Sequence, residues 1–73
     1  MARLPDVEDV IEWLRVRRLR FINARRLAKA FKISSKSAGY ILRKLCGLGY
    51  ISIHKKRRGR FTIYKVNDVV FKS

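Results

Sequence analysis

The side chains with the clearest chemistry in this 73-residue sequence are cationic, and they are densest in a short run near its end. Guanidinium and ammonium groups form charge-assisted hydrogen bonds with phosphate oxygens, so such a run is typical of a surface that binds a polyanion. A nuclear localisation signal has the same composition and is the weaker alternative, because short basic matches are common. The expected phosphate-binding side chains of this run are Lys55, Lys56, Arg57, Arg58 and Arg60.

The charge of the whole chain indicates the same kind of partner. Lysine and arginine number 19 against five aspartate and glutamate residues, which gives a formal net charge of +14. Residues 13–67 contain 17 of the basic side chains and no carboxylate. A surface that needs only to be soluble normally carries both positive and negative charges. The imbalance here therefore favours a nucleic-acid partner, and the alternative is an anionic membrane surface.

Catalytic and metal-binding chemistry is not expected. The carboxylates near the start of the chain have the positions of helix caps, and no glycine-rich phosphate loop occurs. The single cysteine, Cys46, and the single histidine, His54, exclude a site built from repeated Cys or His ligands. We therefore expect no enzyme activity, no cofactor, no metal and no small-molecule substrate.

We expect neither a secretory signal peptide nor a membrane span in this sequence. Its first ten residues lack the apolar core of a signal peptide. The longest uncharged run, residues 45–53, is much shorter than the roughly 20 residues that a membrane span needs. We expect a cytoplasmic, nucleoid-associated protein, and the complete absence of glutamine weakly indicates a thermophilic source.

Apolar spacing predicts the first two elements that position the cations. Asp6 is the expected N-cap of a helix over residues 7–18, which is followed by a short strand over residues 19–22. Trp13 and Val16 lie off the apolar stripe of this helix. They are expected either to pack against a neighbouring element or to form an exposed apolar strip.

Two further helices follow, each with a capping residue. Asn23 is the expected N-cap of a helix over residues 24–31, and Ser34 that of a helix over residues 35–47. Two glycines, Gly47 and Gly49, end the third helix.

Beyond the third helix, the apolar period changes from 3.6 to 2. Residues 50–54 and 60–66 are therefore predicted to be the strands of a hairpin, with the basic run at its tip and Gly59 in the turn. The state of the apolar residues 69–71 stays open.

The third helix is expected to carry the principal binding face. Successive steps of 100° place four apolar residues on one side and a cationic set on the other. Arg43 is the best candidate for reading a base, and Gly39 indicates either close approach of a duplex or close packing on the second helix. The apolar face holds Ala38, Ile41, Leu42 and Leu45. The expected DNA-binding face holds Lys36, Ser37, Tyr40, Arg43 and Lys44.

Two other groups of cations lie on the first two helices. Arg25 and Arg26, together with Lys29, are expected to contact phosphates from the second helix, the alternative being a merely solvated face. A secondary role is expected for the cluster formed by Arg15, Arg17, Arg18 and Arg20.

The segment ISSKSAGYILRKLCGLGYISI, followed after the basic run by RFTIYKV, resembles the winged helix-turn-helix DNA-binding family, in particular small and very basic archaeal-type members. The resemblance covers roughly residues 7–66, and the residues that match its transition from helix to wing are Leu45, Leu48, Gly49, Tyr50 and Ile51. It implies a mainly α fold with a small β-hairpin (α+β), a three-helix bundle plus wing. The length of the chain allows a single domain, over residues 1–73. The resemblance also implies a recognition helix in the major groove and a wing against the backbone or minor groove.

Three hypotheses about function remain open. The first is a double-stranded DNA-binding protein, either a transcription regulator or an architectural factor. The second is an RNA-binding or ribosomal winged-helix protein, which would also explain the basic composition. The third is a protein-interaction adaptor that uses the first helix and the apolar C-terminus as a partner face. Trp13, Val16 and residues 69–71 would be the contacts of a homodimer.

Overall fold

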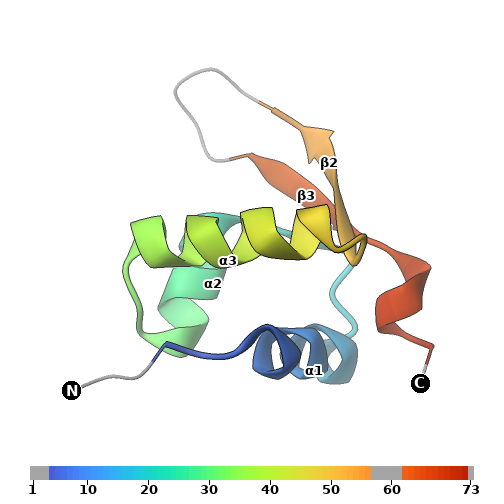
Figure 1. Ribbon diagram of the computed structural model, residues 1–73, viewed down its shortest axis with the longest axis horizontal. Helices are drawn as coiled ribbons and strands as arrows, with labels where there is room; N and C mark the ends of the chain where they lie inside the picture. Colours follow the sequence, from blue (N-terminus) through green and yellow to red (C-terminus); the bar gives the residue numbers. More distant parts are fainter. Residues whose placement is uncertain (1–3, 57–61, 73) are drawn as a thin grey trace.

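The structure is a computed structural model that describes residues 4–56 and 62–72. It has an α+β architecture of three helices, a three-stranded antiparallel sheet and a final 3₁₀ turn (Figure 1). Three of the expected cations, Arg57, Arg58 and Arg60, lie outside the described residues, as does Gly59. The elements are α1 (Val7–Arg17), β1 (Phe21–Ile22), α2 (Ala24–Phe31), α3 (Ser35–Gly47), β2 (Ile51–Lys55), β3 (Ile63–Val66) and η1 (Asp68–Val70).

The first helix, α1, begins where the carboxylates predict and ends one residue before the expected boundary. The backbone N–H of Asp6 donates to Oδ2 of Asp9 at 3.0 Å, which fixes the first turn. At the other end Arg18 has the left-handed conformation, with φ of 52°. The N–H of Leu19 then reaches back to the carbonyl of Leu14 at 3.1 Å, so the helix cannot continue.

The helices α2 and α3 have the bounds that their caps and spacing predict. Oδ1 of Asn23 accepts from the N–H of Arg26 at 2.8 Å, and Oγ of Ser34 accepts from the N–H of Ser37 at 3.1 Å. Each bond satisfies a backbone donor that the first turn of a helix leaves free. Between the two helices Lys32 has a φ of 54°, which turns the chain sharply enough for α3 to pack on α2.

The sheet is more extensive than a simple hairpin, because β1 pairs with β3 to give the order β1-β3-β2. Phe21 lies opposite Lys65, and Ile51 lies opposite Val66. The strand β1 is shorter than expected, although the carbonyl of Arg20 still accepts from the N–H of Val66 at 2.8 Å.

The bounds of β2 and β3 also differ from the prediction. The strand β2 runs from Ile51 to Lys55, one residue later at each end than expected. The N–H of Tyr50 is bound to the carbonyl of Leu45 at 3.1 Å, so Tyr50 belongs to the exit from α3. The strand β3 begins at Ile63, and a register irregularity near His54 bends β2.

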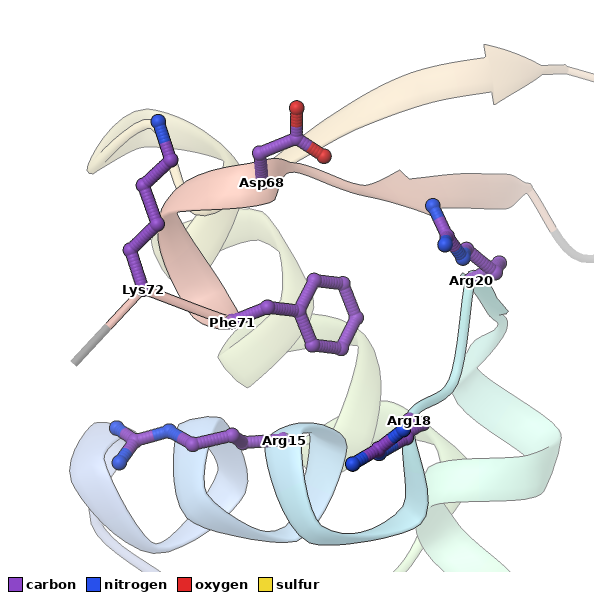
Figure 2. Close-up of a pocket in the computed structure, with 6 residues that line it drawn as sticks. All are labelled: Arg15, Arg18, Arg20, Asp68, Phe71 and Lys72. Atoms are coloured by element: carbon purple, nitrogen blue, oxygen red, sulfur yellow. The ribbon is translucent and has the colours of Figure 1, made fainter.

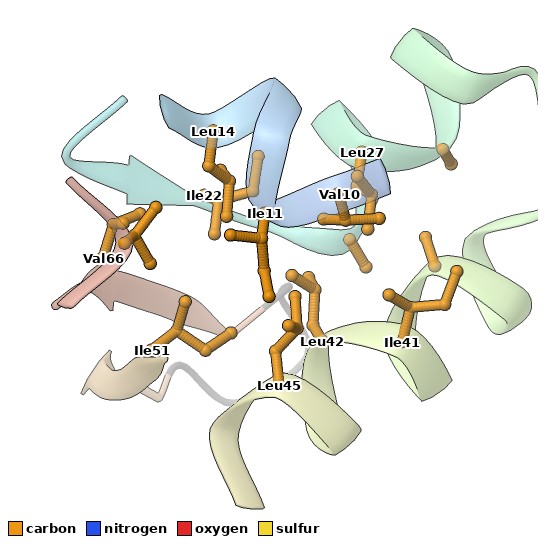
Figure 3. Packing of buried hydrophobic residues seen from close by; sticks show 14 residues of the cluster. Val10, Ile11, Leu14, Ile22, Leu27, Ile41, Leu42, Leu45, Ile51 and Val66 are labelled. Carbon is orange, nitrogen blue, oxygen red and sulfur yellow. The ribbon is translucent and has the colours of Figure 1, made fainter. Parts of the chain in front are cut away.

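One apolar core joins all of these elements (Figure 3). The helices α1, α2 and α3 and the β2–β3 hairpin all contribute side chains to this core. Val70 of η1, which is 1% exposed, closes one end of it. The apolar C-terminal residues, whose state the sequence left open, therefore form a short 3₁₀ turn against α1. The largest fully buried side chains are those of Leu14, Leu27, Leu42, Leu45, Ile51, Val10, Val66 and Val70.

The two apolar residues that lie off the stripe of α1 have different environments. Trp13 packs edge-on against Phe31 of α2, with ring centroids 5.4 Å apart and planes at 73°. Val16 is 69% exposed and contributes nothing to the core. Trp13 therefore links two helices, whereas Val16 remains a lone exposed apolar side chain.

Candidate nucleic-acid interface

The face of α3 opposite the core carries a cationic stripe. Lys36, Tyr40 and Arg43 follow one another at spacings of four and three residues, so they share one line along the helix. All three are exposed, and Tyr40 is 64% exposed despite its aromatic ring. Ala38 and Leu45 on the opposite face are fully buried, which fixes the rotation of the helix and therefore the direction of the stripe.

The stripe forms one wall of a groove, called the α3–β3 groove below. The groove has a volume of about 500 Å³ and lies between α3, the start of α2 and β3. Figure 1 shows the hairpin on the side of α3 that faces away from α1. The residues that line the groove are Ala24, Ser35, Lys36, Gly39, Tyr40, Arg43, Thr62 and Tyr64.

Gly39 lies in the α3–β3 groove and leaves it open. A Cβ built on Gly39 would meet nothing within 4 Å among the described residues. Close packing on α2, one of the two explanations for this glycine, is therefore wrong. The backbone of α3 is accessible from the groove at this point, so a ligand can approach it closely.

The other two expected residues of the α3 face flank the stripe. Lys44 is exposed. Ser37 is only half-buried, and its Oγ accepts a hydrogen bond from Oγ of Ser34 at 3.0 Å. The first role of Ser37 is therefore in the cap of α3, and neither residue lines the α3–β3 groove.

The structure does not bring the two arginines of α2 into this groove. Arg25 and Arg26 are both exposed. Arg26 lines a separate depression of about 270 Å³, together with Arg17 of α1 and Lys29 of α2. This depression lies between α1 and α2, so a ligand in the α3–β3 groove would not fill it.

The hairpin carries the two described cations of the basic run. Lys55 ends β2 and Lys56 follows it, and both are exposed. The remaining members of the run, Arg57, Arg58 and Arg60, lie outside the described residues.

Acidic side chains neutralise few of these cations. Within residues 4–56 and 62–72, one salt bridge forms, between Nη1 of Arg15 and Oε2 of Glu12 at 3.4 Å. No charged side chain in the same part of the chain is buried. The cations of the α3 stripe therefore carry an uncompensated positive field over the groove.

The groove also contains residues that the sequence does not single out for binding, among them Thr62 and Tyr64. Tyr64 is half-buried: it packs against the core and also lines the α3–β3 groove with Thr62. Strand alternation places Thr62, Tyr64 and Val66 on one side of β3. Of these three, Val66 is buried in the core, whereas Thr62 and Tyr64 are half-buried and reach the groove. The sequence alone does not reveal this difference.

The described residues offer neither a cluster of metal ligands nor a membrane-spanning helix. No group of three or more His, Cys, Asp or Glu side chains that could hold a metal ion occurs among them. None of their helices is long and apolar enough to cross a bilayer.

Neither a protein-family model nor a curated protein matches this chain. The function is therefore inferred from the geometry and charge of the groove.

Proposed function

We propose that this protein binds double-stranded DNA as a winged helix-turn-helix domain, either as a transcription regulator or as an architectural factor. In this proposal α3 enters the major groove, and the β2–β3 hairpin acts as the wing against the adjacent backbone or minor groove. The tight turn at Lys32 between α2 and α3, and the hairpin directly after α3, support it.

The observation that carries the proposal is the cationic stripe on α3. Lys36 and Arg43 are seven residue steps apart, which is about 10 Å along the helix. The major groove of B-DNA is about 12 Å wide and admits an α-helix. The uncompensated charge of the stripe suits the negative surroundings of such a groove.

Each groove residue has a role that follows from its chemistry and place. The guanidinium of Arg43 donates two hydrogen bonds to O6 and N7 of a guanine. Lys36 contacts a phosphate, and the hydroxyl of Tyr40 donates to a phosphate on the same strand. Gly39 lets the helix backbone approach the duplex. Lys55 and Lys56 hold the flanking backbone through charge alone.

The salt dependence of binding to a 16-base-pair duplex tests this proposal. If about six to eight phosphates are neutralised, the logarithm of the binding constant falls with log salt at a slope of about −5 to −7. Fluorescence anisotropy at four or more salt concentrations gives the slope. A slope shallower than about −2 contradicts an interface dominated by phosphate contacts.

RNA is the second candidate partner, and one feature of the sheet favours it. Phe21 and His54 lie on the solvent side of the sheet with ring centroids 4.8 Å apart, and Phe21 is 45% exposed. Exposed aromatic rings beside a lysine such as Lys65 resemble the platforms on which proteins stack unpaired bases. Competition between duplex DNA and a structured RNA at fixed salt separates the two. Stronger binding of the RNA, lost on Phe21→Ala, would favour the second candidate.

A further inference from the structure

A further cationic concavity, which we call the α1–η1 pocket, lies outside both the α3–β3 groove and the depression between α1 and α2. It has a volume of about 550 Å³, and no residue lines both this pocket and the α3–β3 groove. Figure 1 shows α1 on the side of α3 away from the hairpin, and η1 packs against α1. Figure 2 shows its cationic side chains around the ring of Phe71. The residues that line the pocket are Arg15, Arg18, Arg20, Asp68, Phe71 and Lys72.

Two of the arginines are held in place by contacts within the protein. Nε of Arg15 donates to the carbonyl of Val70 at 3.2 Å. The guanidinium carbon of Arg20 lies 5.7 Å from the centroid of the Phe71 ring, within the range of a cation–π contact. Their positions relative to η1 are therefore largely set before any ligand arrives, which lowers the entropy lost on binding.

Helix capping alone does not explain the composition of this pocket. Cations near the C-terminus of α1, such as Arg15, also stabilise the helix dipole. Arg20 and Lys72 lie outside any helix and have no such role. Arg18 occupies the left-handed position at the helix end, with φ of 52°, where glycine is the favoured residue. A long cationic side chain is thus present at this pocket despite a backbone conformation that disfavours it.

The cations of the pocket exceed the acids around it. Among the described residues, Asp68 is the only acidic side chain in the lining, against three arginines and one lysine. Within the described ranges, Arg18, Arg20 and Lys72 form no salt bridge, and Arg15 is bound to the exposed Glu12. An open, cationic and partly pre-ordered concavity is suited to the phosphates of a polyanion.

We propose that the α1–η1 pocket binds the phosphodiester backbone of a second nucleic-acid segment, so that one chain bridges two segments. This inference rests on the proposed function of the α3–β3 groove for the first segment. The two sites share no residue, so neither site uses a side chain that the other needs. Contacts with the backbone alone make the second site independent of base sequence.

Bridging is measured by energy transfer between two separate 16-base-pair duplexes, one labelled with a donor and one with an acceptor. The full chain is added at increasing ratios to the duplexes, and binding to one labelled duplex is followed in parallel by anisotropy. Sedimentation of the free protein establishes whether it is a monomer, because a dimer with two α3–β3 grooves would also bridge. We expect transfer to appear with a monomeric protein.

The variant that tests the pocket is Arg18→Glu with Arg20→Glu, two exposed positions. Its matched control is Arg17→Glu with Lys29→Glu, which makes the same change in net charge in the depression between α1 and α2. We expect the pocket variant to lower energy transfer at least fivefold. Its affinity for a single duplex should fall by a smaller factor. The control should keep most of the transfer. Circular dichroism shows whether each variant is folded. If the pocket variant is unfolded, the double variant Arg20→Ala with Lys72→Ala, which removes charge without reversing it, takes its place.

The outcomes separate this inference from the proposed function. Binding of a single duplex without energy transfer overturns the inference and leaves the proposed function standing. Equal loss of transfer in the pocket variant and in its control also overturns it, because net charge would then be the cause. Transfer that persists in the pocket variant contradicts it as well. Absence of single-duplex binding by the wild-type protein contradicts the proposed function itself.

Discussion

At the scale of single residues, the α3 stripe separates two kinds of contact with nucleic acid. Arg43 presents a planar guanidinium that fits the two acceptors on a guanine edge, whereas Lys36 presents a point charge that fits any phosphate. Both project from the face of α3 opposite the core. Loss of the Arg43 guanidinium should therefore change which DNA sites are bound. Loss of the Lys36 ammonium group should change only how tightly all sites are bound.

Arg43→Ala is expected to reduce discrimination between duplexes. Removing one bidentate base contact should lower the free-energy difference between the best site and a random duplex by about 1–3 kcal/mol. The measurement is anisotropy with a site selected from a random pool and with a scrambled duplex. Lys29→Ala, an exposed cation outside the α3–β3 groove, is the control and should weaken both duplexes equally. If Arg43→Ala behaved like this control, Arg43 would be an anchor and not a reader.

Gly39→Ala is expected to change stability and binding in opposite directions. The new methyl group meets no described atom within 4 Å, so helix propensity should raise the stability by about 0.5–1 kcal/mol and Tm by about 3–6 °C. The same methyl group enters the α3–β3 groove and should weaken duplex binding by about 1–3 kcal/mol, the usual cost of overfilling a packed interface.

Thermal melting and anisotropy of the same preparation measure both effects of Gly39→Ala. Gly47→Ala is the matched control, because Gly47 is also helical and unobstructed but does not line the groove. It should not weaken binding. A Gly39→Ala protein that binds the duplex as tightly as the wild type would contradict close approach at this position.

The residues of the stripe could be predicted from the sequence, but their partners across the groove could not. A period of 3.6 is enough to place Lys36, Tyr40 and Arg43 on one face of a helix. Thr62 and Tyr64 join them only through the packing of the hairpin beside α3, which depends on long-range contacts. For the same reason the sequence does not show that Arg26 lies in a different depression.

At the scale of elements, the caps and turns set the bounds of the helices that position the groove. Asn23 and Ser34 each accept a backbone hydrogen bond in the first turn of their helices, and this local chemistry made those helix starts predictable. The pairing of β1 with β3 was not predictable, because a strand of two residues carries almost no periodic signal. The 3₁₀ turn depends on Val70 reaching the core, which is also a tertiary effect.

We expect the hairpin to bind phosphates through its charge and to make no base contact. The double variant Lys55→Ala with Lys56→Ala tests this role. Loss of two phosphate contacts should make the salt slope about two units shallower. Affinity for selected and scrambled duplexes should fall by the same factor. Arg17→Ala with Lys29→Ala is the charge-matched control and should leave the slope nearer to that of the wild type. A change in site preference without a change in slope would place the hairpin in base readout instead.

At the scale of the whole molecule, the net charge of +14 opposes the compact state. A chain of 73 residues has a small core, so this repulsion is a sizeable fraction of its stability. Only one salt bridge relieves it within the described part of the chain. A polyanion bound to the surface would relieve it further, which couples the stability of the fold to its partner.

The melting temperature of the free protein should therefore rise with salt. Screening shortens the range of repulsion from about 30 Å at 0.01 M to about 3 Å at 1 M ionic strength, and the folded state gains most from it. When a duplex is bound, the melting temperature should instead fall with salt, because salt weakens the complex that stabilises the fold. Differential scanning fluorimetry at 0.05 M and 0.5 M sodium chloride measures both. A free protein that melts lower at the higher salt would show that self-repulsion does not limit its stability.

The most direct test of the central claim is to map the bound surface by NMR on the uniformly labelled chain with a 16-base-pair duplex. We expect the largest amide shifts on Lys36, Gly39, Tyr40 and Arg43 of α3 and on Thr62 and Tyr64 beside them. Shifts at Arg18, Arg20 and Lys72 should grow only at higher ratios of duplex to protein, when a second segment binds. Shifts confined to the Phe21 and His54 side of the sheet, or no shifts on α3, would contradict the account.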